Sequence, residues 1–256
     1  MRRAAAVVVL FMLGIGGQFA LNATRPVDSP MAAEGALAAI GGFRSLAAEV
    51  VWFRADRLQR EGRYVELAQL ASTLTFLEPH TPEVWSFAAW NLAYNVSVMM
   101  PTEADRWRWV LASLKLLRDE GLALNPSEPE LYREIAWLFE IKIGGNLDTA
   151  APLYRARWRE IVEDVRARGA WKELGMDPGT MAEIEREYGF SDWTDPLLSA
   201  VYWARLGLAA ATEKLDRAFL SEIMKQSLTI LSRTSKPAPG PRLGPAGAGD
   251  AAGKML

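Results

Sequence analysis

The chain has 256 residues, half of them hydrophobic, and its 29 basic and 31 acidic residues leave a formal net charge of −2. This balance lacks the clustered basic surface that nucleic-acid binding requires, so no nucleic-acid partner is expected. The chain has no cysteine, which excludes disulfides, thiol catalysis and thiolate metal sites.

The N-terminus predicts a membrane anchor. Two arginines precede an apolar segment at residues 4–21, and a helix over this segment rises about 27 Å, close to the ~30 Å of bilayer hydrocarbon. A cleaved secretory signal is the alternative; Ala23 suits its −1 position, but Leu21 at −3 fits poorly. We expect residues 1–21 to be an uncleaved, single-pass signal-anchor in the inner (cytoplasmic) membrane, with the bulk of the chain extracytoplasmic.

Residues 22–42 are rich in Ala, Gly and Pro and predict a linker with a short helix near residues 32–39. From Phe43 onwards, apolar residues recur at a helical period and charged residues fall off that face. Gly62 is expected to end this helix as a left-handed cap.

Helical repeats are predicted over residues 43–168, because each helical pattern begins after a turn containing Gly or Pro. Thr81 and Thr102 stand where N-caps are expected. Beyond Gly62, the helices predicted in this region cover residues 64–77, 83–99, 103–123, 128–143 and 147–168. Asn91 and Asn95 lie one helical turn apart, and buried amides must be hydrogen-bonded, so we expect them to fix the entry to the irregular segment at residues 95–105; ligand binding is the alternative.

Residues 169–235 predict a C-terminal helical cap over the end of the stack. Its helices are expected at residues 180–188, 197–211 and 214–231, with an aromatic loop at 188–193. Residues 236–256 consist mainly of Pro, Gly and Ala and predict a disordered tail, because they cannot bury enough apolar surface.

The turns and aromatic positions resemble the tetratricopeptide repeat, a helix-turn-helix unit of about 34 residues. The matching residues, in chain order, are Gly62, Tyr64, Pro79, Trp85, Pro126, Tyr132, Ala136, Gly145 and Tyr154. Leu67 and Leu74 replace the usual alanines, and the second unit is lengthened, so the resemblance over residues 47–158 is to a divergent repeat. Strings such as Trp52-Phe53-Arg54-Ala55-Asp56 also resemble membrane-anchored, TPR-like bacterial proteins of no assigned activity.

This resemblance implies an all-α fold. The expected architecture is a short right-handed α-α superhelix of about three divergent TPR-like helix pairs with C-terminal capping helices, preceded by a single transmembrane helix. Proteins of this kind bind peptides or partner helices on a concave face. The residues expected near such a groove are Trp52, Asp56, Trp90, Tyr94, Arg133 and Trp137. This acidic, aromatic set suits an apolar helix or a basic segment; the alternative is that the aromatic residues pack between helices.

The chain offers little for catalysis. His80 is the only histidine and lies in a turn between prolines, so neither a metal site nor a cofactor is expected. Paired carboxylates leave one enzymatic alternative, an anchored hydrolase acting on saccharide or cell-wall material. The carboxylates considered for it are Asp56, Glu134 and Glu140 in one groove, and Asp192 and Asp195 beside Trp193. Acidic residues in helical repeats are more often solvated or capping groups. The favoured function is therefore a non-catalytic scaffold that mediates protein-protein interaction outside the cytoplasm.

Overall fold

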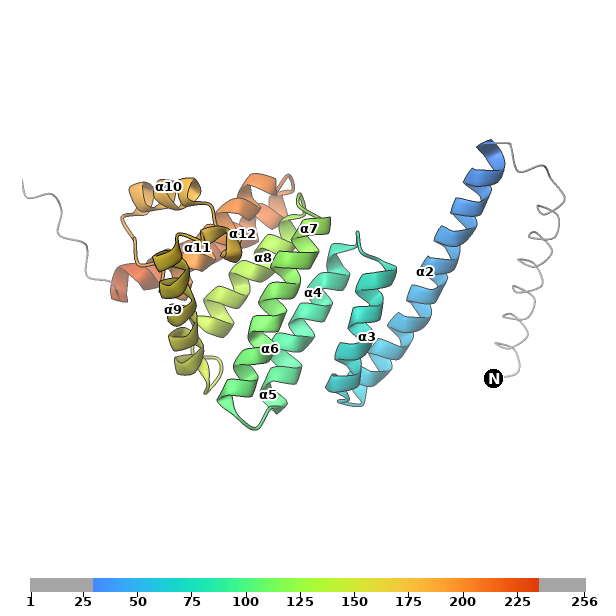
Figure 1. Ribbon diagram of the computed structural model, residues 1–256, viewed down its shortest axis with the longest axis horizontal. Helices are drawn as coiled ribbons and strands as arrows, with labels where there is room; N and C mark the ends of the chain where they lie inside the picture. Colours follow the sequence, from blue (N-terminus) through green and yellow to red (C-terminus); the bar gives the residue numbers. More distant parts are fainter. Residues whose placement is uncertain (1–29, 235–256) are drawn as a thin grey trace, which may run out of the picture. The chain divides into compact units, whose positions relative to one another are not determined.

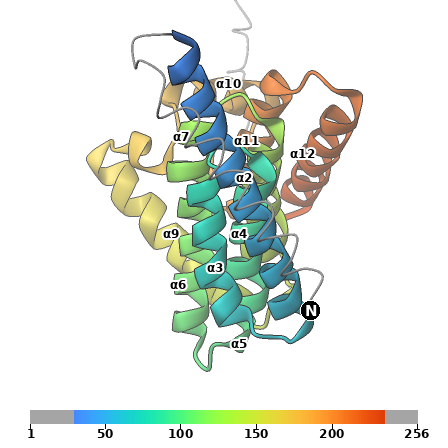
Figure 2. The ribbon, with the colours of Figure 1, turned by 90° about the vertical axis from the view of Figure 1, so that its right-hand side faces the viewer.

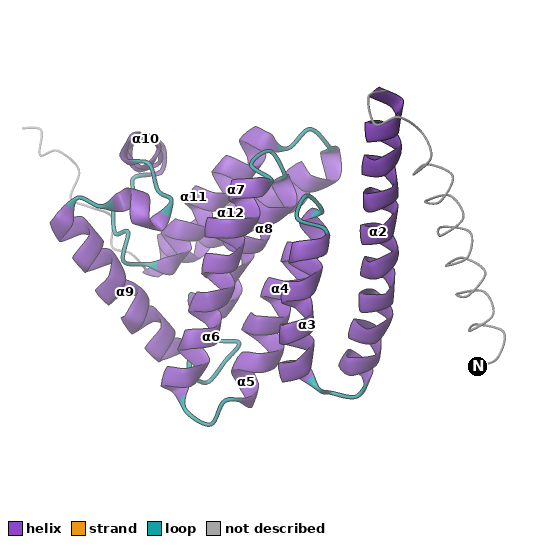
Figure 3. Ribbon diagram, turned by 45° about the vertical axis from the view of Figure 1, so that its right-hand side comes forward, coloured by secondary structure: helices purple, strands orange, loops and turns teal. Residues whose placement is uncertain are grey.

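The structure is a computed structural model, and it describes residues 30–234. Every element in this range is a helix, joined to the next by turns and short loops (Figure 3), so the predicted all-α class is confirmed. Within residues 30–234, no helix is both long and apolar enough to cross a bilayer. The anchor predicted at residues 1–21 and the tail predicted at residues 236–256 lie outside the described residues.

The first described helix, α2 (Pro30–Arg60), begins earlier than predicted. Residues 30–42, where the sequence predicted a linker with a short helix near residues 32–39, are part of this uninterrupted helix. Proline is well tolerated in the first turn of a helix and alanine is the strongest helix former, which together explain the early start. The described residues fall into two compact units, which meet between Arg57 and Leu58 in the chain.

The second unit begins with a sharp turn into α3 (Tyr64–Leu77). Gly62 in this turn has a φ of +69°, which confirms the predicted left-handed cap. The amide of Arg63 donates a hydrogen bond to the carbonyl of Leu58 at 3.0 Å, as expected when a chain leaves a helix through such a cap.

Three long helices follow, and each contains a π-helical turn that the sequence did not predict. They are α4 (Pro82–Trp90) with η1 (Asn91–Val96) and α5 (Ser97–Met99); α6 (Glu103–Lys115) with η2 (Leu116–Gly121) and α7 (Leu122–Leu124); and α8 (Pro129–Trp137) with η3 (Leu138–Ile143). As predicted, Thr102 caps α6, since its hydroxyl accepts a hydrogen bond from the amide of Asp105 at 3.1 Å. Thr81 is the N-cap residue of α4, but its side chain makes no capping hydrogen bond.

The segments around α4 and α8 are equivalent, at an interval of 47 residues. Pro79 and Pro126 precede the two helices, and each proline carbonyl accepts a hydrogen bond from an aromatic side chain six residues later. Trp85 Nε1 donates to Pro79 at 2.9 Å and Tyr132 Oη donates to Pro126 at 2.8 Å. This interval exceeds the ~34 residues of the tetratricopeptide repeat.

The rest of the unit is formed by α9 (Ala151–Arg168), η4 (Trp171–Leu174), α10 (Pro178–Tyr188), α11 (Pro196–Ala210) and α12 (Lys214–Thr234). The start of α9 is four residues later than predicted, because Asp148 holds a turn there by accepting a hydrogen bond from the amide of Ala150 at 3.0 Å. Helix α11 packs against α8 and α12. Helices α3, α4, α6 and α8 lie side by side (Figure 1), and α9 and α12 flank them on opposite sides (Figure 2).

The core lies between α6, α8, α9 and α11, and it is aromatic. Trp158 on α9 is only 1% exposed, and its ring centroid lies 4.7 Å from that of Phe139 in an edge-on contact. On α11, Tyr202 and Trp203 are also buried, with ring centroids 5.5 Å apart. Much of the high tryptophan content therefore serves packing.

Candidate binding groove

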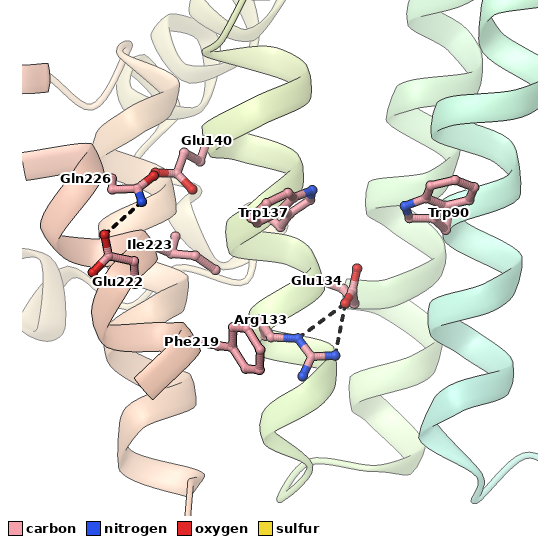
Figure 4. A pocket seen from close by; sticks show the side chains of 9 residues that line it. All are labelled: Trp90, Arg133, Glu134, Trp137, Glu140, Phe219, Glu222, Ile223 and Gln226. Carbon is pink, nitrogen blue, oxygen red and sulfur yellow. Dashed lines mark hydrogen bonds and ion pairs between the residues drawn. The ribbon is translucent and has the colours of Figure 1, made fainter. Parts of the chain in front are cut away.

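A groove with a volume of about 460 Å³ lies along α8, with α12 on one side and α4 on the other (Figure 4). We call it the acidic groove. It is lined by Trp90, Arg133, Glu134, Trp137, Glu140, Phe219, Glu222, Ile223 and Gln226.

Three aromatic side chains of the acidic groove are exposed to solvent. Trp90 is 47% exposed, Trp137 is 41% exposed and Phe219 is 51% exposed. Trp90 and Trp137 are the equivalent residues of α4 and α8, since each is the last residue before a π-helical turn. π-helical turns are frequent at functional sites, and half-exposed aromatics gathered in a concavity are typical of ligand-binding surfaces.

Arg133 is held by acidic residues at one end of the groove. Its Nη2 lies 3.2 Å from Glu134 Oε1 and 3.9 Å from Glu130 Oε1, and its Nη1 lies 3.6 Å from Asp216 Oδ1. Its guanidinium carbon also lies 5.8 Å from the centre of the Phe219 ring. Burial raises the pKa of Glu134, and the charge of Arg133 opposes this shift in part. The positive charge of Arg133 is thus already compensated within the protein.

Glu140 is a buried carboxylate at the other end of the groove. It is 3% exposed, and its Oε1 accepts a hydrogen bond from Ser227 Oγ at 3.5 Å. Its Oε2 is also buried and has no hydrogen-bond partner among the described residues. Burial raises the pKa of Glu140 to about 7; the Ser227 hydrogen bond lowers this pKa and the negative charge of Glu222 raises it. A buried polar atom left unpaired is costly and calls for an explanation.

Glu222 lies at the rim. Its side chain is 53% exposed and lies 3.8 Å from Lys225 Nζ, and it accepts a hydrogen bond from Gln226 Nε2 at 2.8 Å. The nine lining residues therefore include three carboxylates and one cation.

The structure brings three of the six predicted site residues into the acidic groove: Trp90, Arg133 and Trp137. Tyr94 packs beside Trp90, with ring centroids 5.2 Å apart, but it does not line the groove. Burial and the charge of Glu134 raise the pKa of Tyr94, and an interaction of its hydroxyl with the side chain of Trp137 opposes this shift in part.

The other two predicted residues, Trp52 and Asp56, belong to the first unit and are not among the lining residues. Trp52 is half-buried and Asp56 is exposed.

Sequence reasoning missed the contribution of α12, which was predicted to be part of a cap. Phe219 and Ile223 stand four residues apart, and so do Glu222 and Gln226, so one face of α12 carries all four into the groove. The pattern is visible in the sequence, but nothing local indicates which helix it faces.

The other predicted carboxylate pair has a structural role. Asp195 caps α11 by accepting a hydrogen bond from the amide of Leu197 at 2.9 Å, and Asp192 accepts hydrogen bonds from the amide and hydroxyl of Thr194. Trp193 is 3% exposed, and its Nε1 donates to Glu185 Oε1 at 2.6 Å. These residues stabilise a loop and do not form an open pair of carboxylates.

The predicted structural role of Asn91 and Asn95 is confirmed. Asn95 Nδ2 donates to Asn91 Oδ1 at 3.0 Å, and Asn91 Nδ2 donates to the carbonyl of Tyr64 at 3.3 Å. His80 is exposed in its turn. In the part of the chain that the structure describes, no three or more His, Asp or Glu side chains are grouped so as to hold a metal ion.

Comparison with protein-family models, with curated proteins and with solved structures finds no match to this chain. The resemblance to the tetratricopeptide repeat therefore stays a prediction, and the function has to be argued from the acidic groove.

Proposed function

We propose that the chain is a non-catalytic scaffold that binds a segment of a protein partner in the acidic groove. The observation that carries this proposal is the pair of half-exposed tryptophans, Trp90 and Trp137, at equivalent places on two helices beside one concavity. Tryptophan is enriched among the residues that dominate protein interfaces. Phe219, which is 51% exposed, adds further apolar area for burying a partner side chain.

The location of this scaffold is part of the proposal and rests on the sequence. The apolar segment at residues 4–21 follows two arginines, which supports an anchor in the inner membrane with the helical region outside the cytoplasm. Divergent TPR-like repeats forming a right-handed superhelix are likewise proposed from the residues that resemble that family.

A hydrolase acting on saccharide is the second candidate, and one observation favours it. Glu140 has a pKa raised to about 7 in a groove that also contains Glu222 and two exposed tryptophans, as a general acid requires. Against this candidate, Glu134 is paired with Arg133 and Glu222 accepts a hydrogen bond from Gln226. We therefore favour binding over catalysis.

The test is selection of peptides from a random 12-residue display library on the full-length chain in detergent micelles. We expect the selected peptides to lose at least tenfold in affinity for the double variant Trp90→Ala/Trp137→Ala. Phe76→Ala is the matched control, because Phe76 is an exposed aromatic that does not line the groove; it should leave the affinity unchanged. Peptides that bind the double variant equally well would refute the proposal.

A second measurement addresses the hydrolase directly. Solubilised cell-wall saccharide is incubated with the full-length chain and with Glu140→Gln, and the release of reducing ends is followed. The scaffold proposal expects no release by either protein. Release by the wild type that is lost in Glu140→Gln would establish the hydrolase instead.

A further inference from the structure

We infer that the acidic groove recognises a lysine side chain of the partner, with the ammonium bound to Glu140 and the methylene stem lying against the exposed ring of Trp137. This inference rests on the proposed binding function and adds the chemistry of the partner. Its starting point is Glu140, a residue that lines the groove and whose buried Oε2 has no partner among the described residues.

The two ends of the groove differ in how their charges are balanced. Arg133 packs near Phe219 at one end, and Ser227 donates to Glu140 at the other. Arg133 and Glu140 are seven residues apart on the same helix, or about 10 Å. Figure 4 shows this separation, with Arg133 and Phe219 together and Glu140 beside Gln226. Arg133 has three acidic neighbours, whereas none of the nine lining residues supplies a cation to Glu140.

The walls beside Glu140 suit the stem of a long cationic side chain. Trp137 is 41% exposed and supplies the apolar surface, whereas Ile223 in the same groove is only 4% exposed. Lysine buries its methylene groups against apolar surface while its ammonium stays with polar partners. Exposed indole rings also attract cations through the negative charge of their faces. A partner that supplied only an apolar side chain would leave Glu140 Oε2 unpaired.

The hydrogen bonding of Glu140 favours lysine over arginine. Ser227 Oγ already donates to Glu140 Oε1 at 3.5 Å, whereas Oε2 has no partner among the described residues. A guanidinium binds carboxylates best through two parallel hydrogen bonds to both oxygens, whereas an ammonium is a compact point charge. The site therefore fits the ammonium group of lysine better.

The test uses three small probes: the N-acetyl, N-methylamide derivatives of lysine, norleucine and arginine. Their binding to the full-length chain in detergent is followed through the indole NMR signals of Trp90 and Trp137. We expect lysine to bind at least tenfold more tightly than norleucine, which has the same stem without the charge, and more tightly than arginine. The Glu140→Gln variant should bind lysine and norleucine with about equal affinity.

Glu120→Gln is the matched control, because Glu120 is an exposed acid that does not line the groove; it should keep the preference. Equal binding of lysine and norleucine to the wild type would overturn the inference, and this comparison needs no variant to fold. An undiminished lysine preference in Glu140→Gln would overturn it as well.

The peptides selected on the groove separate this inference from the proposed function. Replacement of each lysine in those peptides by norleucine should reduce affinity at one position. The binding of some peptides could require Trp90 and Trp137 and yet be unaffected when their lysines are replaced by norleucine. This result would support the proposed function and refute the inference. Peptides independent of both tryptophans would refute the proposed function itself.

Discussion

Lys142 Nζ lies 2.8 Å from Asp148 Oδ2, and the two side chains are only 1% and 4% exposed. The carboxylate of Asp148 is fully engaged: Tyr154 donates to Oδ2 at 2.9 Å, and Arg106 and Ala150 donate to Oδ1. The Lys142 ammonium also lies 5.4 Å from the centre of the Tyr94 ring. This ion pair therefore links the turn before α9 to the helix that carries the acidic groove.

Removal of one partner of this pair is expected to be strongly destabilising. Asp148→Asn leaves Lys142 as an uncompensated buried charge, which costs about 3–5 kcal/mol. Glu160→Gln is the control, because Glu160 pairs with Arg157 at 2.7 Å and the two side chains are 60% and 47% exposed, and exposed pairs contribute about 0–1 kcal/mol. Thermal unfolding followed by circular dichroism compares the two variants. Equal effects would show that burial of the Lys142–Asp148 pair does not matter.

The stability of the fold is expected to fall in acid because of Asp148. Burial alone raises its pKa, but the hydrogen bonds from Ala150, Lys142 and Tyr154 outweigh burial and hold the pKa of Asp148 well below its usual range. A carboxylate whose pKa is lower in the folded state stabilises the fold at pH values above its unfolded-state pKa of about 3.9. This stabilisation is lost as the pH falls from about 3.9 toward the folded-state pKa. Unfolding measured between pH 5 and pH 2 should show a steeper decline for the wild type than for Asp148→Asn.

Glu140 is expected to give the opposite dependence at higher pH. Its pKa in the folded state is about 7, above the unfolded-state value of about 4.3. The folded protein therefore binds more protons than the unfolded chain between these values, so this group lowers stability as the pH rises from 4.3 to 7. The neighbours that act on the carboxylate are Ser227 and Glu222, both on α12. Glu140→Gln should flatten the pH dependence in this range, and an unchanged slope would contradict the raised pKa.

Signals that lie within a few residues of one another predicted much of the fold. Helix α3 has the predicted bounds because Gly62 supplies a left-handed turn, and α6 begins where the Thr102 cap predicts. The π-helical turns were missed, since the apolar period that predicts a helix does not distinguish an α-turn from a π-turn. The hydrogen bond between Ser227 and Glu140 could not be predicted either, because the two residues are 87 positions apart in the sequence and only tertiary packing brings them together.

Gly62 provides a test of the first turn. Its φ is +69°, and no heavy atom lies within 4 Å of the place that a Cβ would take. Gly62→Ala therefore meets no clash, so its cost comes from the backbone alone, about 1 kcal/mol. Gly42→Ala is the matched control, because Gly42 lies within helix α2 and also has open space around it; alanine there should stabilise the helix by about 0.5–1 kcal/mol. Thermal unfolding should thus change in opposite directions, and a stabilising Gly62→Ala would rule out a left-handed residue at this turn.

The tryptophans separate packing from recognition. Trp158 is 1% exposed, and its replacement by Ala should cost about 3–5 kcal/mol, as for large aromatic residues in cores. Trp90 and Trp137 are 47% and 41% exposed, so each buries about half the area that a core tryptophan buries, and its replacement by Ala should cost roughly 2 kcal/mol. The same two substitutions should weaken the binding of groove-selected peptides, whereas the milder Trp158→Phe should leave it unchanged. Stability losses of equal size at Trp90 and Trp158 would identify Trp90 as a core residue. Trp90 would then not be available for binding a partner in the acidic groove.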